Sequence, residues 1–188
     1  MNELLRSKQT VFSFKELILL WGNLEVKTAK SRVNYYVRKG QLYHIRRGLY
    51  GKDKNYDRYE LANKIFSPSY ISFETVSGAA GLTFQYYSQI FLASYQTREL
   101  ICDDQKFSFK TIKDSILLDT TGIEKRESYY IASPERAFLD MIYLHPTYYF
   151  DNLSTLNWEK VYAILPIYNS RRMEKAVKVY QDEYMKSL

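Results

Sequence analysis

The chain has 188 residues, of which 46% are hydrophobic and 26% charged, which excludes a disordered chain and allows one large domain or two modest ones. No stretch approaches the roughly 18 uninterrupted apolar residues of a membrane helix, so a membrane protein is also excluded at this stage. Residues 1–60 hold 13 Lys/Arg against 6 Asp/Glu, whereas residues 61–188 hold 14 against 15, so the net charge of +6 comes from the first third.

This basic first third indicates a module that binds a polyanion, with a solvated basic face as the alternative. The opening residues MNELLRSKQT lack the apolar core of a signal peptide, which predicts a cytoplasmic protein. Ser13 and Glu16 form a capping box, and Phe12 and Leu17 stand at the spacing of a hydrophobic staple. The first helix is therefore predicted over Phe14–Trp21.

A second helix is predicted over Lys27–Lys39, with Gly40 as its stop and Arg38 and Lys39 at its basic end. Its buried stripe has helical spacing and consists of Ala29, Val33, Tyr36 and Val37. Its outward face and flanks carry Lys27, Thr28, Lys30, Ser31, Arg32, Asn34, Tyr35 and Arg38. Two short helices with these faces are typical of a helix-turn-helix, although any amphipathic helix pair remains an alternative.

A hairpin is predicted next, with Tyr43–Arg46 and Leu49–Tyr50 as strands around an Arg47-Gly48 turn. Alternation places Tyr43 and Ile45 on one face of the first strand, and His44 and Arg46 on the other. Residues 1–56 are therefore predicted to form a winged helix-turn-helix domain that binds double-stranded DNA. The predicted contacts are Lys27, Thr28, Lys30, Ser31, Arg32, Asn34, Tyr35, Arg38, His44, Arg46 and Arg47.

Residues 57–188 are predicted to form a mixed α/β domain, which makes the whole chain α+β. Asp57 and Glu60 suggest a capping box for a helix over Arg58–Phe66. Tyr70–Ser72 is predicted to be extended, and a helix is expected over Phe73–Ala80. Composition predicts four or five antiparallel strands between Gln89 and Ile131.

The single cysteine, Cys102, cannot form an internal disulfide, and we expect a small buried hydrophobe rather than a reactive thiol. His44 and His145 lie far apart without partners at metal spacing, so neither a metal site nor another cofactor is expected. Ser133 is predicted to cap a helix that starts at Pro134 and ends at His145. Arg136 and Asp140 in it are interpreted as a surface pair of spacing i, i+4.

Two further helices are predicted, Trp158–Ile164 with Asn157 as its cap, and Arg171–Met185. The second has an apolar stripe of Met173, Ala176, Val177, Tyr180 and Tyr184. Packing of this stripe onto the second domain is the ordinary explanation, and a dimer interface is the alternative.

Three blocks, VRKGQLYHIRRGLY (37–50), SPSYISFETVSGAAGL (67–82) and YIASPERAFLDMIYL (130–144), have an order and spacing that resemble the AbiEi-type antitoxins of type IV toxin–antitoxin systems. The resemblance implies a repressor that binds inverted repeats in its own promoter, as a monomer that pairs on two half-sites. It also implies that the second domain counters a nucleotidyltransferase-like toxin without a stable complex. No catalytic residue is expected, since Ser133 is better explained as a helix cap than as a nucleophile.

Two other functions stay open. Asp104-Gln105-Lys106 after an apolar run is the pattern of a metal-dependent nuclease, for which Glu74 is the available upstream acid. Such a nuclease would cleave DNA with magnesium or manganese. A repressor whose second domain senses a ligand is the other alternative, and it requires a sizeable pocket with converging polar groups.

Overall fold

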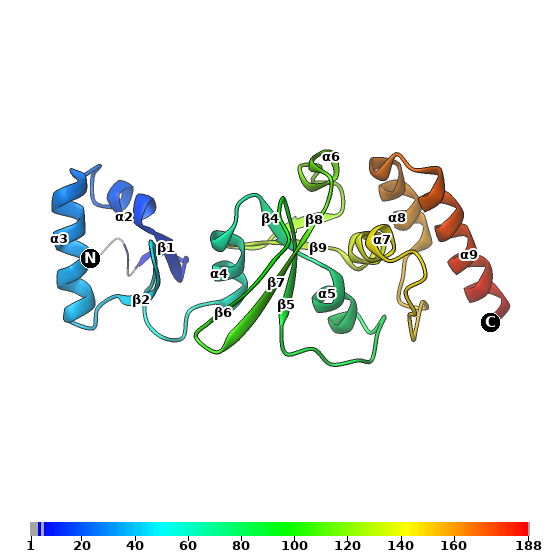
Figure 1. Cartoon of the computed structure of the whole chain (residues 1–188), viewed down its shortest axis with the longest axis horizontal. Coiled ribbons are helices and arrows are strands. Elements are labelled where there is room, and N and C mark those ends of the chain that lie inside the picture. The colour runs from blue at the N-terminus through cyan, green and yellow to red at the C-terminus, as the bar shows by residue number, and fades with distance from the viewer. Residues whose placement is uncertain (1–3, 5, 188) are drawn as a thin grey trace.

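The structure, a computed structural model, describes residues 4 and 6–187 and has a mixed α+β architecture. Figure 1 shows an elongated molecule in which α3 lies at one end of the long axis and α9 at the other, with a large sheet between them. None of the helices in the described ranges combines the length and the apolar character that crossing a membrane requires.

The N-terminal region, meaning the described residues up to 56, contains two helices and a three-stranded antiparallel sheet of order β1-β3-β2. Its elements are β1 (Val11–Ser13), α2 (Phe14–Leu20), α3 (Val26–Arg38), β2 (Tyr43–Arg46) and β3 (Leu49–Gly51). Both predicted helices are present, each ending one residue earlier than predicted. The capping box at Ser13 is confirmed, since Ser13 Oγ accepts from Glu16 N and the Glu16 carboxylate accepts from Ser13 N.

The three-stranded sheet is covered on both faces, because neighbouring residues of β1 point to opposite sides. Phe12 packs with Leu17 and Val33 in the small core beneath α2 and α3. Val11 and Ile45 instead belong to the large core of the C-terminal region, which comprises residues 57–187. The sheet therefore joins the two parts of the chain through apolar packing.

The C-terminal region contains a six-stranded sheet of order β6-β7-β5-β4-β9-β8. Its strands are β4 (Ser69–Ile71), β5 (Ile90–Ser94), β6 (Arg98–Cys102), β7 (Gln105–Thr111), β8 (Ile123–Lys125) and β9 (Tyr130–Ala132). The prediction of an antiparallel sheet is wrong for two pairs, since β5 runs parallel to β7 and β4 runs parallel to β9. The β6–β7 hairpin folds back so that β7, and not β6, lies beside β5. The chain reverses twice between β5 and β7, so these two strands run in the same direction.

The sheet is accompanied by α4 (Arg58–Ile65), α5 (Phe73–Ala79), α6 (Asp114–Leu117), α7 (Pro134–Leu144), α8 (Trp158–Ile164), η1 (Leu165–Tyr168) and α9 (Arg171–Ser187). The predicted caps are confirmed, because Ser133 and Asn157 accept from backbone N–H groups of α7 and α8. The short elements α6 and η1 were not predicted. Met173 and Val177 of α9 are fully covered, so the predicted apolar stripe packs onto the C-terminal region.

Candidate nucleic-acid interface

The outward face of α3 is open to solvent at the end of the molecule, and no other element lies over it in Figure 1. The predicted contacts with exposed side chains on this helix are Lys27, Thr28, Lys30, Ser31, Asn34, Tyr35 and Arg38. Ala29 and Val33, on the opposite side, are buried as predicted. Arg32 differs from the rest, since it is half-buried with its guanidinium 5.4 Å from the centre of the Trp21 ring.

The start of α3 is electrostatically unusual. Every other α-helix from α2 to α9 has an aspartate or glutamate in its first turn, where a carboxylate meets the positive end of the helix dipole. α3 has no acid there and carries Lys27 instead, with Lys30 close behind. The acid of α3 is instead Glu25 at the N-cap, just outside the first turn, so Lys27 and Lys30 matter here as exposed cations that an external anion can reach.

The helix and the hairpin share a surface hollow, which we call the helix–hairpin groove. It has a volume of about 380 Å³ and is lined by Phe14, Lys30, Val33, Asn34, Arg47, Gly48 and Tyr50. Lys30 and Asn34 come from the outward side of α3, and Arg47 comes from the turn between β2 and β3. The groove therefore brings predicted contacts from both elements onto one continuous surface.

The hairpin presents its three predicted contacts in different ways. Arg47 is exposed in the turn, next to Gly48, whose φ of +79° suits glycine. His44 is exposed and its ring lies 5.3 Å from the Tyr50 ring, on the groove side of the sheet. The pairing register shifts between His44 and Arg46, so the predicted alternation of side chains along β2 is interrupted there.

Arg46 is half-buried and is not among the residues that line the helix–hairpin groove. Burial raises the pKa of the Cys102 thiol and nearby Asp103 raises it further, whereas the positive charges of Arg46 and Arg58 oppose this rise. The Cys102 thiol also lies 3.9 Å from the carbonyl oxygen of Ile45. Cys102 itself is 8% exposed, which confirms a buried cysteine.

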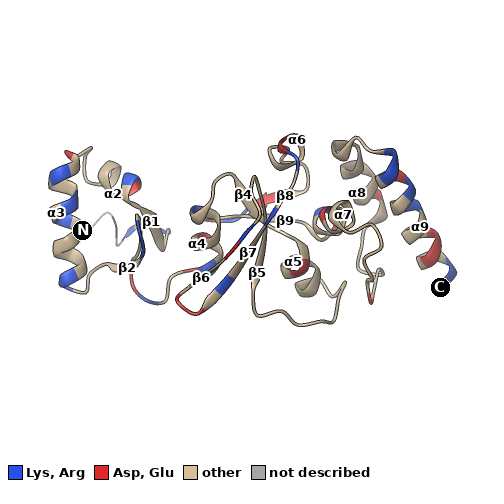
Figure 2. Ribbon diagram, viewed as in Figure 1, with Lys and Arg blue, Asp and Glu red and all other residues tan. Residues whose placement is uncertain are grey.

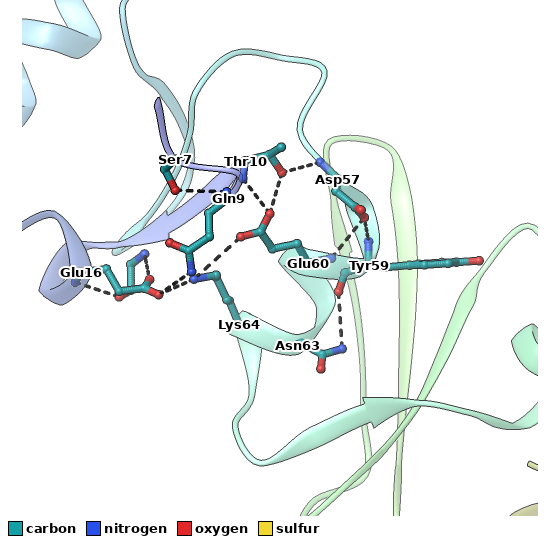
Figure 3. A network of polar contacts seen from close by, with 10 residues as sticks. Ser7, Gln9, Thr10, Glu16, Asp57, Tyr59, Glu60, Asn63 and Lys64 are labelled. Atoms are coloured by element: carbon teal, nitrogen blue, oxygen red, sulfur yellow. Dashed lines mark hydrogen bonds and ion pairs between the residues drawn. The ribbon is translucent and has the colours of Figure 1, made fainter. Parts of the chain in front are cut away.

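A polar cluster that the sequence did not reveal connects the N-terminal region to α4, and we call it the junction network (Figure 3). Its centre is Glu60, which is fully buried and accepts hydrogen bonds from Thr10 N at 2.8 Å and Thr10 Oγ1 at 2.7 Å. The Thr10 hydroxyl also accepts from Asp57 N at 2.8 Å. Asp57 caps α4 as predicted, but Glu60 does not complete a capping box, because its carboxylate turns to Thr10.

Lys64 extends this network to the first helix. Its ammonium lies 2.5 Å from Glu16 Oε1 and 4.0 Å from Glu60 Oε1. Burial raises the pKa of Glu16, but hydrogen bonds from Lys64 and Ser13 outweigh it and the pKa is lowered overall. The same glutamate that caps α2 therefore also ties α2 to α4, which fixes the orientation of the N-terminal region.

A second buried cluster, the Arg136 network, lies inside the C-terminal region and corrects an expectation. Arg136 and Asp140 are not a surface pair, since both side chains are 0% exposed. The Asp140 carboxylate accepts from Arg136 Nε at 3.3 Å, and three hydroxyl groups complete its shell: Tyr70 at 2.9 Å, Ser72 at 2.7 Å and Tyr168 at 2.7 Å. The remaining guanidinium nitrogens donate to Tyr70 and to the carbonyl groups of Ile116, Asp119 and Thr121.

The residues considered for a nuclease are engaged in ordinary structural contacts. Asp104 and the preceding Asp103 form the β6–β7 turn with positive φ angles, which aspartate tolerates. Lys106 pairs with Glu99 across the hairpin at 2.9 Å, and Glu74 pairs with Lys110 at 2.9 Å. In the described part of the chain, no group of three or more His, Cys, Asp or Glu side chains is arranged to hold a metal ion.

The core of the C-terminal region is filled by buried side chains, and its hollows lie at the surface. One of about 700 Å³ lies between α5 and the loop 83–89, and it also touches Arg58 and Tyr59 of α4. Thr83 lines this hollow with a side chain 4% exposed, and its hydroxyl has no hydrogen-bond partner among the described residues. This is the feature closest to the pocket that a ligand sensor requires.

Comparison with known protein families finds no matching family, and comparison with curated protein sequences finds no matching relative. The function of the chain is therefore inferred from its own residues and their geometry.

Proposed function

We propose that the chain is a sequence-specific DNA-binding repressor whose N-terminal region acts as a winged helix-turn-helix. In this proposal residues 1–56 form the DNA-binding domain and residues 57–188 form a second domain. The observation that carries the proposal is the helix–hairpin groove, where Lys30 and Asn34 of α3 and Arg47 of the hairpin line one hollow. A helix in the major groove beside a cationic hairpin on the backbone is how winged domains dock on DNA.

The exposed residues of α3 divide by chemistry into two kinds of contact. Lys27, Lys30 and Arg38 would neutralise phosphates and set the salt dependence of binding. Thr28, Ser31 and Asn34 offer hydrogen-bonding groups to base edges, although the Ser31 hydroxyl donates to the Lys27 carbonyl at 3.2 Å in the free chain. Tyr35 and Arg32 would lie along the backbone, with Arg32 held by Trp21.

We further propose, from the resemblance to AbiEi-type antitoxins, that the protein represses its own operon and counters a nucleotidyltransferase-like toxin. The proposed operator is a pair of inverted repeats, bound by monomers that pair on the DNA in the cytoplasm. One of the resembling blocks, YIASPERAFLDMIYL, contains Arg136 and Asp140, so this part of the resemblance coincides with the centre of the C-terminal core.

The DNA-binding proposal is tested with Arg46→Ala/Arg47→Ala on a duplex from the upstream promoter. Measured by fluorescence anisotropy over a range of salt concentrations, the double variant should bind more weakly, with a salt slope lower by about one or two phosphate equivalents. The single variants refine the result. Arg47→Ala should account for most of the change, because Arg47 is exposed and lines the groove, whereas Arg46 is half-buried and does not line it.

Lys113→Ala/Lys186→Ala is the matched control, since both lysines are exposed and outside the groove. It removes the same charge as the double arginine variant. An unchanged slope in the arginine variant, or an equal change in the control, would remove the hairpin from the mechanism. The antitoxin proposal is tested by the adjacent reading frame, which should encode a nucleotidyltransferase-like toxin whose growth arrest is relieved when this chain is co-expressed.

A ligand-sensing repressor is the second candidate, favoured by the 700 Å³ hollow and the unpaired Thr83 hydroxyl. Ala79 lines the hollow and is exposed, so Ala79→Trp should fill it without disturbing the core. In a promoter–reporter strain, a ligand sensor would lose its response to a metabolite extract in this variant while still repressing. Equal repression by both chains under all conditions would argue against sensing.

A further inference from the structure

The first half of α9 carries a line of cations at the end of the molecule opposite α3 (Figure 2). Arg171, Lys175 and Lys178 follow the spacing i, i+4 and i+7, so they project from one side of the helix. All three side chains are exposed, whereas Met173 and Val177 on the other side are buried. We call these three residues the α9 ridge.

None of the three ridge cations forms an ion pair within the described residues. Glu174 and Asp182 stand four residues before and after Lys178 on α9, but neither pairs with it. The neighbouring Arg172 differs, because its guanidinium donates to the Tyr143 carbonyl at 2.9 Å. Elsewhere lysines such as Lys64 and Lys110 are held by glutamates. The charge of the ridge is therefore directed to solvent.

The position of the ridge also opposes the helix dipole. Arg171 is the first residue of α9, directly after Ser170, and Lys175 lies one turn further on. Positive side chains near a helix N-terminus lower helix stability, and Glu174 in the same first turn offsets part of this effect. What distinguishes the ridge is therefore the exposure and spacing of its three cations.

We propose that the α9 ridge is a second contact surface for the phosphate backbone of duplex DNA. The ridge is about 10 Å long, since seven residues rise about 1.5 Å each, so its charges lie within about one Debye length of one another. Duplex DNA, with one charge per about 1.7 Å of axis, presents several phosphates within the length of this row. The proposal rests on the proposed function, which places the chain on DNA.

The two DNA-binding surfaces lie at opposite ends of the long axis, so they meet separate DNA segments (Figure 1). One chain bound to its promoter through α3 then holds a second duplex through α9. The contact through α9 is independent of sequence, because lysine and arginine side chains in a row address phosphates and not base edges.

The test uses the full chain and the variant Arg171→Gln/Lys175→Gln/Lys178→Gln. The charge-matched control is Lys113→Gln/Lys125→Gln/Lys160→Gln, whose lysines are exposed and lie outside α9. Thermal unfolding first establishes that both variants are folded. Promoter duplex is immobilised on beads, each protein is added, and capture of a labelled duplex of random sequence is measured.

Wild type and control should capture the random duplex, and the ridge variant should lose most of this capture while its affinity for the promoter stays within about twofold. In solution, its salt slope on the random duplex should fall by about two to three units. Capture and slope equal to wild type would overturn the proposal while the repressor function stands. If the wild type does not bind the promoter, the salt slopes of wild type and ridge variant on the random duplex still decide for or against the ridge. If the wild type binds neither duplex, both proposals are refuted.

Discussion

The arginines of this chain occupy two opposite environments, one inside the C-terminal core and one around the helix–hairpin groove. Arg136 is fully buried, and its guanidinium is surrounded by the Asp140 carboxylate, a tyrosine hydroxyl and three backbone carbonyl groups. Arg38 and Arg47 are exposed at the other extreme, and the described structure gives neither of them an ion pair. The same side chain therefore serves the fold in one place and is free to bind a ligand in the other.

The difference follows from the cost of burying a charge. A buried guanidinium requires a complete set of acceptors, because an unpaired charge in the core costs several kcal/mol. An exposed guanidinium keeps its water and can exchange it for phosphate when DNA arrives. Mutations in the Arg136 network should therefore act on stability, and mutations at Arg47 should act on binding.

The largest effect is expected for Asp140→Ala. The change leaves the Arg136 charge buried without its carboxylate and removes the acceptor of Tyr70, Ser72 and Tyr168. Breaking a buried ion pair from one side costs about 3–5 kcal/mol of unfolding free energy. Urea unfolding followed by circular dichroism measures it.

The control for this comparison is Asp182→Ala, an exposed carboxylate on α9, which should change stability by less than about 0.5 kcal/mol. Asp140→Asn keeps the shape of the side chain and should fall between the two. A loss below about 1 kcal/mol for Asp140→Ala would contradict the view that this network holds the core together.

A smaller effect is expected at the junction network, which is polar and only partly buried. Thr10→Val keeps the volume of the side chain but removes the hydroxyl that donates to Glu60 and accepts from Asp57 N. Leaving buried polar groups unsatisfied costs about 1–3 kcal/mol. Thr155→Val at an exposed position is the control. Equal stability of the two variants in urea unfolding would show that water replaces the hydroxyl.

Helix starts were predictable from sequence because their signals are local. Ser13, Ser133 and Asn157 each cap a helix by accepting from a backbone N–H group three residues ahead. The outward face of α3 was predictable for a similar reason, since helical spacing separates Ala29 and Val33 from the exposed cations. These features depend only on neighbours within one or two turns.

The buried polar networks were not predictable, because their partners lie far apart in the chain. Glu60 meets Thr10 across 50 residues, and Arg136 meets Tyr70 across 66. From sequence spacing alone, Glu60 is predicted to complete a capping box and Arg136 to form a surface pair with Asp140. The strand order escaped prediction in the same way, since the parallel pairing of β5 with β7 depends on how the β6–β7 hairpin folds back. The three-residue strand β1 is too short to show alternation.

The smallest effect is a pH dependence at Glu16, whose carboxylate joins α2 to Lys64. Its pKa is lowered in the folded chain, because hydrogen bonds from Lys64 and Ser13 outweigh the effect of burial. A carboxyl group with a lowered folded pKa stabilises the protein above its ordinary pKa of 4.5, and this contribution disappears as the pH falls through the folded value. Because the Glu16 side chain is 34% exposed, solvent screening limits the contribution to about 1 kcal/mol.

Glu16→Gln should therefore be less stable than wild type at pH 7, and the difference should shrink as the pH falls below about 4.5, the ordinary value for this group. Urea unfolding at both ends of this range measures the difference. Glu99→Gln, which removes the more exposed pair with Lys106, should change stability by less than about 0.5 kcal/mol at either pH. A Glu16→Gln difference that stays constant with pH would mean that the loss does not come from the charge of Glu16, and that this charge does not hold α2 to α4.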